Sequence, residues 1–127
     1  MKAHWIVLAL CLASSSAEAM YVENYAAWRG MGTAQKEGVA IGAFDGAFGI
    51  VKPNDSDAMS LWAGIRDCTI SLKLDSSMLR QLVETRYQQQ TVDWDKPAAW
   101  IVYDEVKRLC RTAINKYRAE AGLPPQP

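Results

Sequence analysis

The amino-acid sequence predicts a small all-α protein, a bundle of four to five helices held by one disulfide. Three observations support this fold class. Half of the 127 residues are apolar and 22% are charged, which is the balance of a folded chain. Apolar residues recur at helical spacing along most of the chain. Two cysteines, Cys68 and Cys110, remain once a predicted leader is removed.

Residues 1–19 have the composition of a secretory signal peptide. A short basic start precedes nine consecutive apolar residues, 5–13, and Ala17-Glu18-Ala19 fits the cleavage site of such leaders. This apolar run is too short to cross a bilayer as a helix, so we expect no membrane span. Cleavage after Ala19 would leave a single helical domain, residues 20–127, in the periplasm or outside the cell.

Two helices are expected in the first part of the mature chain. Residues 21–29 carry apolar side chains at helical spacing, and Gly30 and Gly32 then interrupt the pattern. Thr33 is a suitable N-cap for a second helix over residues 34–50, which ends before a turn at residues 52–55.

A third helix is expected over residues 57–66, with Asp55 or Ser56 as its N-cap. The next segment, residues 68–74, alternates apolar and polar side chains as a strand does. A lone strand has no partner in an otherwise helical chain. We therefore expect an extended linker there, with its apolar side chains packed on the helices.

The fourth helix begins at Asp75-Ser76 and continues to about Gln90, because residues 78, 79, 82, 83, 86 and 87 follow helical spacing. A loop over residues 91–96 separates it from the last helix. Asp95 is a suitable N-cap for that last helix, and Pro97 suits its first turn.

The last helix has the clearest pattern in the sequence. An apolar stripe runs from Ala99 to Tyr117 at steps of three and four residues, and charged residues, Glu105 among them, fill the opposite face. Gly122 fits a C-cap. We expect one unbroken helix that ends at about residue 121.

The charge balance and the histidine count exclude several classes of function. Fourteen basic residues match fourteen acidic ones, which argues against a protein that binds nucleic acid through its phosphates. The only histidine, His4, lies in the leader, so the mature chain has no imidazole for Ser-His-Asp or Cys-His catalysis or for a zinc site. No pair of acids is singled out by its spacing for hydrolysis. We expect no catalytic residue, metal site or cofactor, and a protein as partner.

The two mature cysteines predict a disulfide between Cys68 and Cys110, because an exported chain with an even cysteine count normally oxidises them. A loop closed over these 42 positions would stabilise the fold by about 4 kcal/mol in the chain-entropy description. The alternative is a pair of buried free thiols.

Three glycines, Gly38, Gly42 and Gly46, recur every four residues and would line one face of the second helix. Each glycine inside a helix costs about 1 kcal/mol relative to alanine, so close approach by another helix should offset the cost. This ridge predicts either packing within the monomer, against the last helix, or a homodimer seam. Asp45 lies beside it, and its burial or exposure is left open.

A surface candidate for binding a partner is the loop sequence Asp93-Trp94-Asp95. Tryptophan is over-represented at the energetic centres of protein interfaces, and the two flanking acids keep this loop polar. The alternative is a loop tryptophan that packs onto the helices it connects.

Several features occur in an order that resembles a known family. Gly-Val-Ala-Ile-Gly-Ala-Phe-Asp-Gly-Ala (38–47) is followed by Cys68, by Leu-Asp-Ser-Ser-Met-Leu-Arg-Gln-Leu (74–82), by Pro-Ala-Ala (97–99) and by Cys110. In this order they resemble the Rap1a/Tai family, small periplasmic immunity proteins that neutralise amidase effectors of type VI secretion systems. The resemblance implies that the two cysteines pair and that the partner is a secreted peptidoglycan amidase.

We therefore expect a periplasmic immunity or inhibitor protein that binds and blocks a peptidoglycan amidase effector of a type VI secretion system. Such a protein needs rigidity, export and a surface that fills a cleft, and a cross-linked helical bundle is compatible with all three. Two alternatives stay open. One is a periplasmic acid-stress chaperone-like protein, which exposes apolar surface when its carboxylates are protonated. The other is a non-catalytic binding module of the cell envelope.

Overall fold

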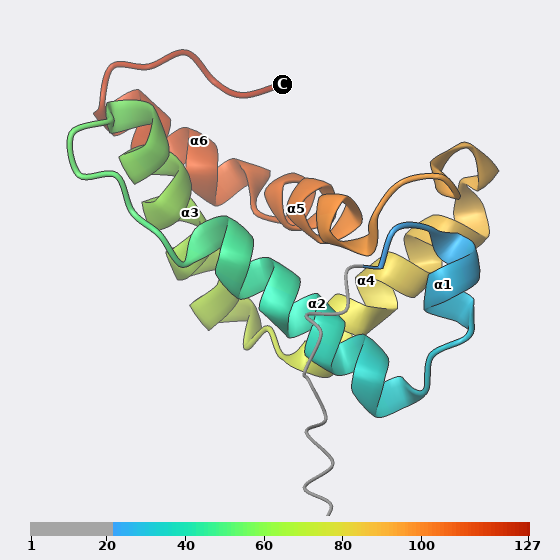
Figure 1. The fold of residues 1–127 in the computed structure, drawn as a ribbon. Helices are drawn as coiled ribbons and strands as arrows, with labels where there is room; N and C mark the ends of the chain where they lie inside the picture. The colour runs from blue at the N-terminus through green and yellow to red at the C-terminus, as the bar shows by residue number, and fades with distance from the viewer. Residues whose placement is uncertain (1–21) are drawn as a thin grey trace, which may run out of the picture.

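The computed structural model describes residues 22–127, and the predicted signal peptide lies outside them. This part of the chain is all-α and contains no strand, as predicted. Its elements are α1 (Tyr25–Arg29), α2 (Thr33–Phe48), α3 (Ser56–Leu72), α4 (Ser76–Gln89), the 3-10 turn η1 (Thr91–Asp93), α5 (Ala98–Leu109) and α6 (Arg111–Glu120) (Figure 1). None of these helices is long and apolar enough to span a membrane.

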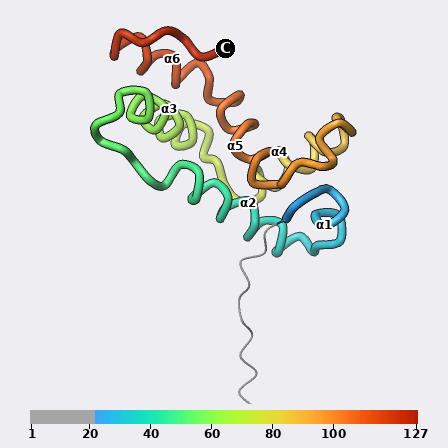
Figure 2. The backbone as a smooth tube through the Cα atoms, turned by 45° about the horizontal axis from the view of Figure 1, so that its top comes forward, coloured from blue at the N-terminus to red at the C-terminus, as the bar shows by residue number. Residues whose placement is uncertain are grey.

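The helices form two packed groups. One group consists of α2, α4 and α5, which contact one another, and the other is the antiparallel pair α3 and α6. Figure 2 shows that pair at one end of the molecule, with α1 at the other end. The chain passes between the groups at the turn after α2, at the turn after α3 and at the junction of α5 with α6.

The core lies mainly between α4 and α5 and under α2. The apolar stripes predicted for these helices supply it, because helical spacing places every third or fourth side chain on one face. Its largest fully buried side chains are Trp28, Tyr87, Leu79, Ile101, Ile114, Val83, Val102, Val106 and Cys110.

Two predicted helix starts are confirmed by their capping bonds. The carboxylate of Asp55 accepts hydrogen bonds from the backbone N–H groups of Asp57 and Ala58 at 3.0 and 3.1 Å, which settles the choice between Asp55 and Ser56. The carboxylate of Asp75 accepts from the N–H of Met78 at 2.8 Å. These bonds satisfy donors that the first turn of a helix otherwise leaves free.

Two other capping predictions are wrong. Thr33 is the first helical residue, and Gly32 is the N-cap. Asp95 does not cap α5, because Pro97 occupies the N-cap position with extended backbone angles and makes no side-chain capping bond. The N–H of Ala98 instead donates to the backbone oxygen of Val22 at 3.1 Å, so the N-terminal segment completes this helix start.

The predicted extended linker at residues 68–74 is also wrong, because α3 continues through it to Leu72. No glycine or proline interrupts residues 66–72, and a helix satisfies backbone groups that an unpaired extended segment would leave without partners. Lys73 ends the helix in the left-handed conformation, with φ 52°. Ile70 and Leu72 are 66% and 43% exposed, so the alternating pattern does not mark buried positions.

The predicted unbroken last helix is interrupted at Cys110, whose φ of −96° and ψ of 9° are not helical. The interruption lets α5 pack on α2 and α4 while α6 packs on α3, which one straight helix does not achieve. It also raises the number of α-helices in residues 22–127 to six. Within the predicted polar face of α5, Glu105 is buried, for reasons described below.

The predicted disulfide is confirmed. Cys68 of α3 is bonded to Cys110 at the α5–α6 junction, with an S–S distance of 2.02 Å and Cα atoms 5.5 Å apart. This bond excludes the alternative of two free thiols. It ties the α3–α6 pair to the end of α5.

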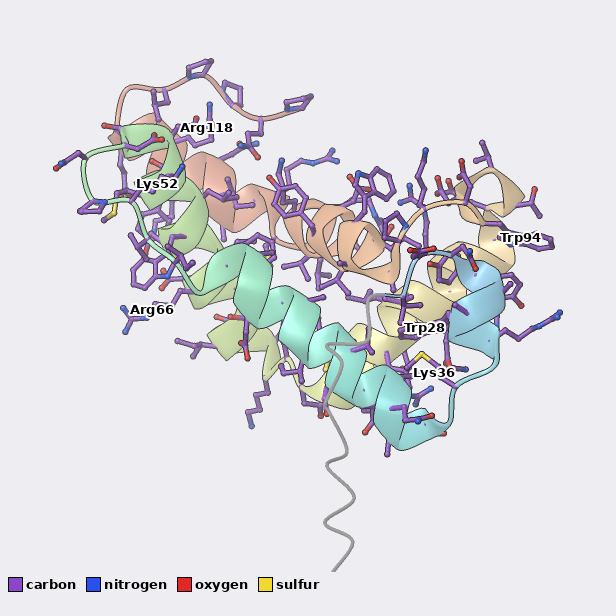
Figure 3. The ribbon with its side chains drawn as sticks, in the orientation of Figure 1. Trp28, Lys36, Lys52, Arg66, Trp94 and Arg118 are labelled. Carbon is purple, nitrogen blue, oxygen red and sulfur yellow. A yellow bond between two sulfur atoms is a disulfide. The ribbon has the colours of Figure 1, made fainter. Side chains whose placement is uncertain are left out.

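The C-terminal tail is held against α6 by two side chains. The Asn115 amide donates to the backbone oxygen of Gln126 at 3.2 Å and accepts from its N–H at 2.8 Å. The buried Arg118 donates to the backbone oxygen of Pro124 at 2.6 Å and also pairs with Asp57 of α3. Figure 3 shows Arg118 beside the returning tail, which thus covers part of α6.

Candidate functional site

A groove of about 480 Å³ lies between α4 and α5, and the turn after α3 closes one end of it. The lining of this α4–α5 groove has an apolar part and a polar part, and we call the polar part the polar wall. The apolar side chains are those of Leu72, Leu74, Met78, Leu82 and Leu109, and the polar ones are those of Gln81, Thr85, Arg86, Gln89, Gln90, Glu105 and Arg108.

The groove depends on the two places where the helices depart from the sequence-based expectation. Because α3 extends to Leu72 and turns sharply at Lys73, it delivers Leu72 and Leu74 to the end of the groove. Because α5 ends at Leu109, that side chain stays 41% exposed at the rim. Exposed leucines on both sides of a groove are typical of a surface that binds another molecule.

The polar wall is organised by Arg86. Its Nε donates to Asp93 at 2.5 Å, and its Nη1 donates to Glu105 at 2.6 Å and to Asp104 at 3.1 Å. The side chains of Arg86, Asp93 and Glu105 are only 14%, 8% and 5% exposed. The second oxygen of Glu105 accepts from Arg108 at 2.5 Å, so two arginines enclose this carboxylate.

Arg86 and Glu105 both have pKa values shifted in the direction that keeps them charged at neutral pH. Burial alone lowers the pKa of Arg86, but its bonds to Asp93 and Glu105 raise the pKa well above the ordinary value. Burial alone raises the pKa of Glu105, but the hydrogen bonds of Arg108 and Arg86 bring it below 4.5. Burial, together with the charge of Asp93, raises the pKa of Tyr87 to about 12.

The charges of the wall are held in ion pairs. A general acid needs a pKa near the working pH, whereas Glu105 is ionised at neutral pH and neutralised by two arginines. No group of three His, Cys, Asp or Glu side chains within residues 22–127 is arranged to hold a metal ion. The groove therefore offers shape, apolar area and fixed charge.

Arg86, the centre of this network, enters the sequence prediction only as part of a helical stripe. It lies one turn after Val83 and next to Tyr87, both of which are fully buried. A cation on the buried face of a helix requires acidic partners, because an unpaired buried charge is expensive. That placement is the signal from which the network could have been inferred.

The three residues of the loop Asp93-Trp94-Asp95 differ in their surroundings, and the role of this loop in binding a partner stays a prediction. Asp93 is buried in the Arg86 network, while the side chain of Asp95 is 75% exposed. Trp94 is 46% exposed, and its ring stacks on Tyr25 with centroids 5.0 Å apart. Its indole N–H donates to the backbone oxygen of Tyr87 at 2.8 Å. Trp94 thus packs on its neighbours and still presents one edge at the end of the molecule (Figure 3).

The predicted packing of Gly38, Gly42 and Gly46 inside the monomer is wrong. A Cβ added to any of them meets no other heavy atom within 4 Å among the described residues. α2 instead contacts its neighbours through another face, which carries the buried Ala40 and Phe48. The homodimer seam stays a prediction. Asp45, which is next to Gly46 in the sequence, is exposed, and this settles the question of its burial.

The glycine that does permit close helix packing is Gly64 of α3. A Cβ there would lie 2.4 Å from the Cα of Ile114 in α6, much closer than real atoms approach. The sequence offers a weak signal for this residue, a lone glycine inside a helix that lacks the repeat of the other three. Gly64 fixes the α3–α6 pair and thereby the position of the disulfide.

The groove and its charged wall lie beside the disulfide, since Leu72 and Leu109 flank both. No protein-family description, curated protein or solved structure matches this chain.

Proposed function

We propose that the chain is an exported immunity or inhibitor protein that binds and blocks a peptidoglycan amidase effector of a type VI secretion system. The α4–α5 groove would supply the contact surface. A surface that is already formed before binding loses less conformational entropy than a flexible one, so a small protein of this kind can inhibit tightly.

The observation that carries the proposal is the Cys68–Cys110 bond at the edge of the groove. Disulfides of this kind persist in oxidising compartments, which include the periplasm where peptidoglycan amidases act. The bond also fixes the two helices that present Leu72 and Leu109. The amidase as partner class comes from the resemblance to the Rap1a/Tai family.

The direct test is protection of cells. Amidase effectors are sent to the periplasm of a host that co-expresses the full chain, and lysis is followed by culture density. We expect the full chain to prevent lysis by at least one amidase, and the same chain without residues 1–19 to fail. Absence of protection against a panel of such amidases, with none recovered by the immobilised mature protein, would refute the proposal.

The acid-stress chaperone is the second candidate, and the Arg86 network favours it. Protonation of Glu105 at low pH would remove one partner of Arg86 and loosen the contact between α4 and α5. The test lowers the pH of the purified protein while dye binding and the aggregation of a client enzyme are measured. A native near-UV spectrum at about pH 2–3, below the ordinary carboxyl pKa values, would rule this candidate out.

A further inference from the structure

We infer that the α4–α5 groove binds a protein segment that is apolar along one side and acidic at one end. The inference rests on the proposed binding function and names the chemistry of the partner segment. It follows from two adjoining hollows that share one side chain, Arg108.

The first hollow is the α4–α5 groove, which would take the apolar side of the segment. Leu72 and Leu109 stand at its rim, 43% and 41% exposed, and Met78 and Leu82 of α4 also line it. Burial of such side chains by a partner removes apolar surface from water. An apolar side of a helix or an extended strand fits a groove of about 480 Å³.

The second hollow, of about 390 Å³, continues from the groove along α5 and the start of α6. It is lined by three basic side chains, Lys107, Arg108 and Arg111, together with Asp104, Gln126 and Pro127, and we call it the basic hollow. Asp104, which accepts a bond from Arg86 at 3.1 Å, is the one acidic side chain among these lining residues, against three basic ones.

The cations of the basic hollow have capacity for an added carboxylate. Arg111 makes no ion pair within residues 22–127. Arg108 uses Nε and Nη2 on Glu105 and is still 60% exposed. Lys107 lies over the ring of Tyr103, 5.0 Å from its centroid. Guanidinium groups bind carboxylates through paired, charge-assisted hydrogen bonds, which gives the acidic end of a segment a defined place.

A second copy of this chain is a poorer occupant than a different protein. In the described chain, exposed apolar and acidic side chains lie together in the loop after α4, at Val92, Trp94 and Asp95. Insertion of this loop into the groove of another copy would be a head-to-tail contact, which gives rings or open chains unless two copies insert their loops into each other.

The test uses a fluorescent peptide of about 14 residues, about 21 Å long as a helix. It carries leucines at i, i+3, i+4 and i+7 and a run of glutamates at one end, and a second peptide has lysines in place of the glutamates. Fluorescence anisotropy measures binding to the mature, oxidised protein. We expect the acidic peptide to bind about tenfold more tightly than the basic one.

Two pairs of charge reversals locate the site. Lys107→Glu with Arg111→Glu should weaken the binding of the acidic peptide by about tenfold. Arg29→Glu with Lys52→Glu, which changes the net charge equally at exposed sites away from the groove, should alter binding by less than about twofold. Leu72→Gln and Leu109→Gln test the apolar contacts of the groove, and each should weaken the binding of both peptides. Thermal melting verifies that every variant is folded.

Equal binding of both peptides, or equal weakening by the two pairs of reversals, would overturn the inference. Light scattering adds a further check, because loss of self-association in the Lys107→Glu, Arg111→Glu variant would identify a second copy as the occupant and also overturn it. Failure of the proposed function is distinguishable from these outcomes. Peptide binding without protection from amidases would refute the amidase as partner and support the inferred peptide preference of the groove. Protection from an amidase without preference for the acidic peptide would support the proposed function and refute the inference.

Discussion

Arg86 joins acidic side chains from two parts of the chain, Asp93 of η1 and Asp104 and Glu105 of α5. The arginine thereby sets the angle at which the loop after α4 returns to form α5. Charges as little exposed as those of Arg86 and Glu105 stabilise the fold only while both partners are present.

Removal of this arginine should be costly. We expect Arg86→Met to lower the free energy of unfolding by about 3 kcal/mol, because it leaves two buried carboxylates without a cation. Lys96→Met, which removes an exposed pair with Asp95 at 3.8 Å, should cost about 0.5 kcal/mol. Urea denaturation measures both values. Equal effects of the two substitutions would contradict the structural role of Arg86.

The lowered pKa of Glu105 has a consequence for stability against pH. A carboxyl whose pKa is lower in the folded than in the unfolded chain stabilises the fold fully above its ordinary value of 4.5, and this contribution is lost as the pH falls through that value and past the folded pKa. We expect the melting temperature of the wild type to fall between pH 6 and about 3, and Glu105→Gln to reduce the slope. Glu23→Gln serves as the control, since its side chain is exposed. An unchanged slope in Glu105→Gln would show that other carboxylates govern acid stability.

At the scale of the elements, two kinds of helical glycine should respond oppositely to alanine. Gly64→Ala should destabilise the protein by about 2 kcal/mol, because its methyl group collides with the backbone of Ile114. Gly42→Ala should stabilise it by up to about 1 kcal/mol, because alanine favours the helix and the position is open. Thermal melting compares them.

The same glycine variants test the homodimer. If a second copy covers Gly38, Gly42 and Gly46, Gly42→Ala should shift the protein toward the monomer in light scattering and should not stabilise it. Stabilisation with no change in mass would remove the last interpretation of this ridge as an interface.

Local signals in the sequence were sufficient to predict where α3 and α4 begin. Asp55 and Asp75 begin their helices as predicted, because a capping carboxylate acts on the next turn of its own chain. The interruption at Cys110 depends on contacts between helices, which no local pattern shows. The extension of α3 was missed because residues 68–74 alternate as a strand does, although nothing in residues 66–72 breaks a helix. These two departures create the rim of the groove, so the sequence alone did not reveal the site. The sequence leaves open whether Trp94 is a surface anchor or packs on the helices, and the role of Asp93 depends on Arg86, seven residues earlier.

For the molecule as a whole, the described chain contains two helical groups, and the Cys68–Cys110 disulfide links them beside the groove. The α3–α6 pair contributes Leu72, and the α2–α4–α5 group contributes Met78, Leu82 and Leu109. The shape of the groove therefore depends on how the two groups are held together. In this respect the disulfide affects binding as well as stability.

Loss of the disulfide should affect both properties. We expect Cys68→Ser with Cys110→Ser to lower the free energy of unfolding by about 4 kcal/mol, because the bond closes a loop of 42 residues and restricts the unfolded chain. In the folded variant, amide hydrogen exchange should quicken at the end of α3 and the start of α6, while α4 keeps its protection. Inhibition of an amidase by the variant should weaken in parallel, because the rim leucines lose their fixed separation. A variant that keeps full inhibition despite quickened exchange would show that the partner binds away from the groove, and attention would then move to the end of the molecule that carries Trp94.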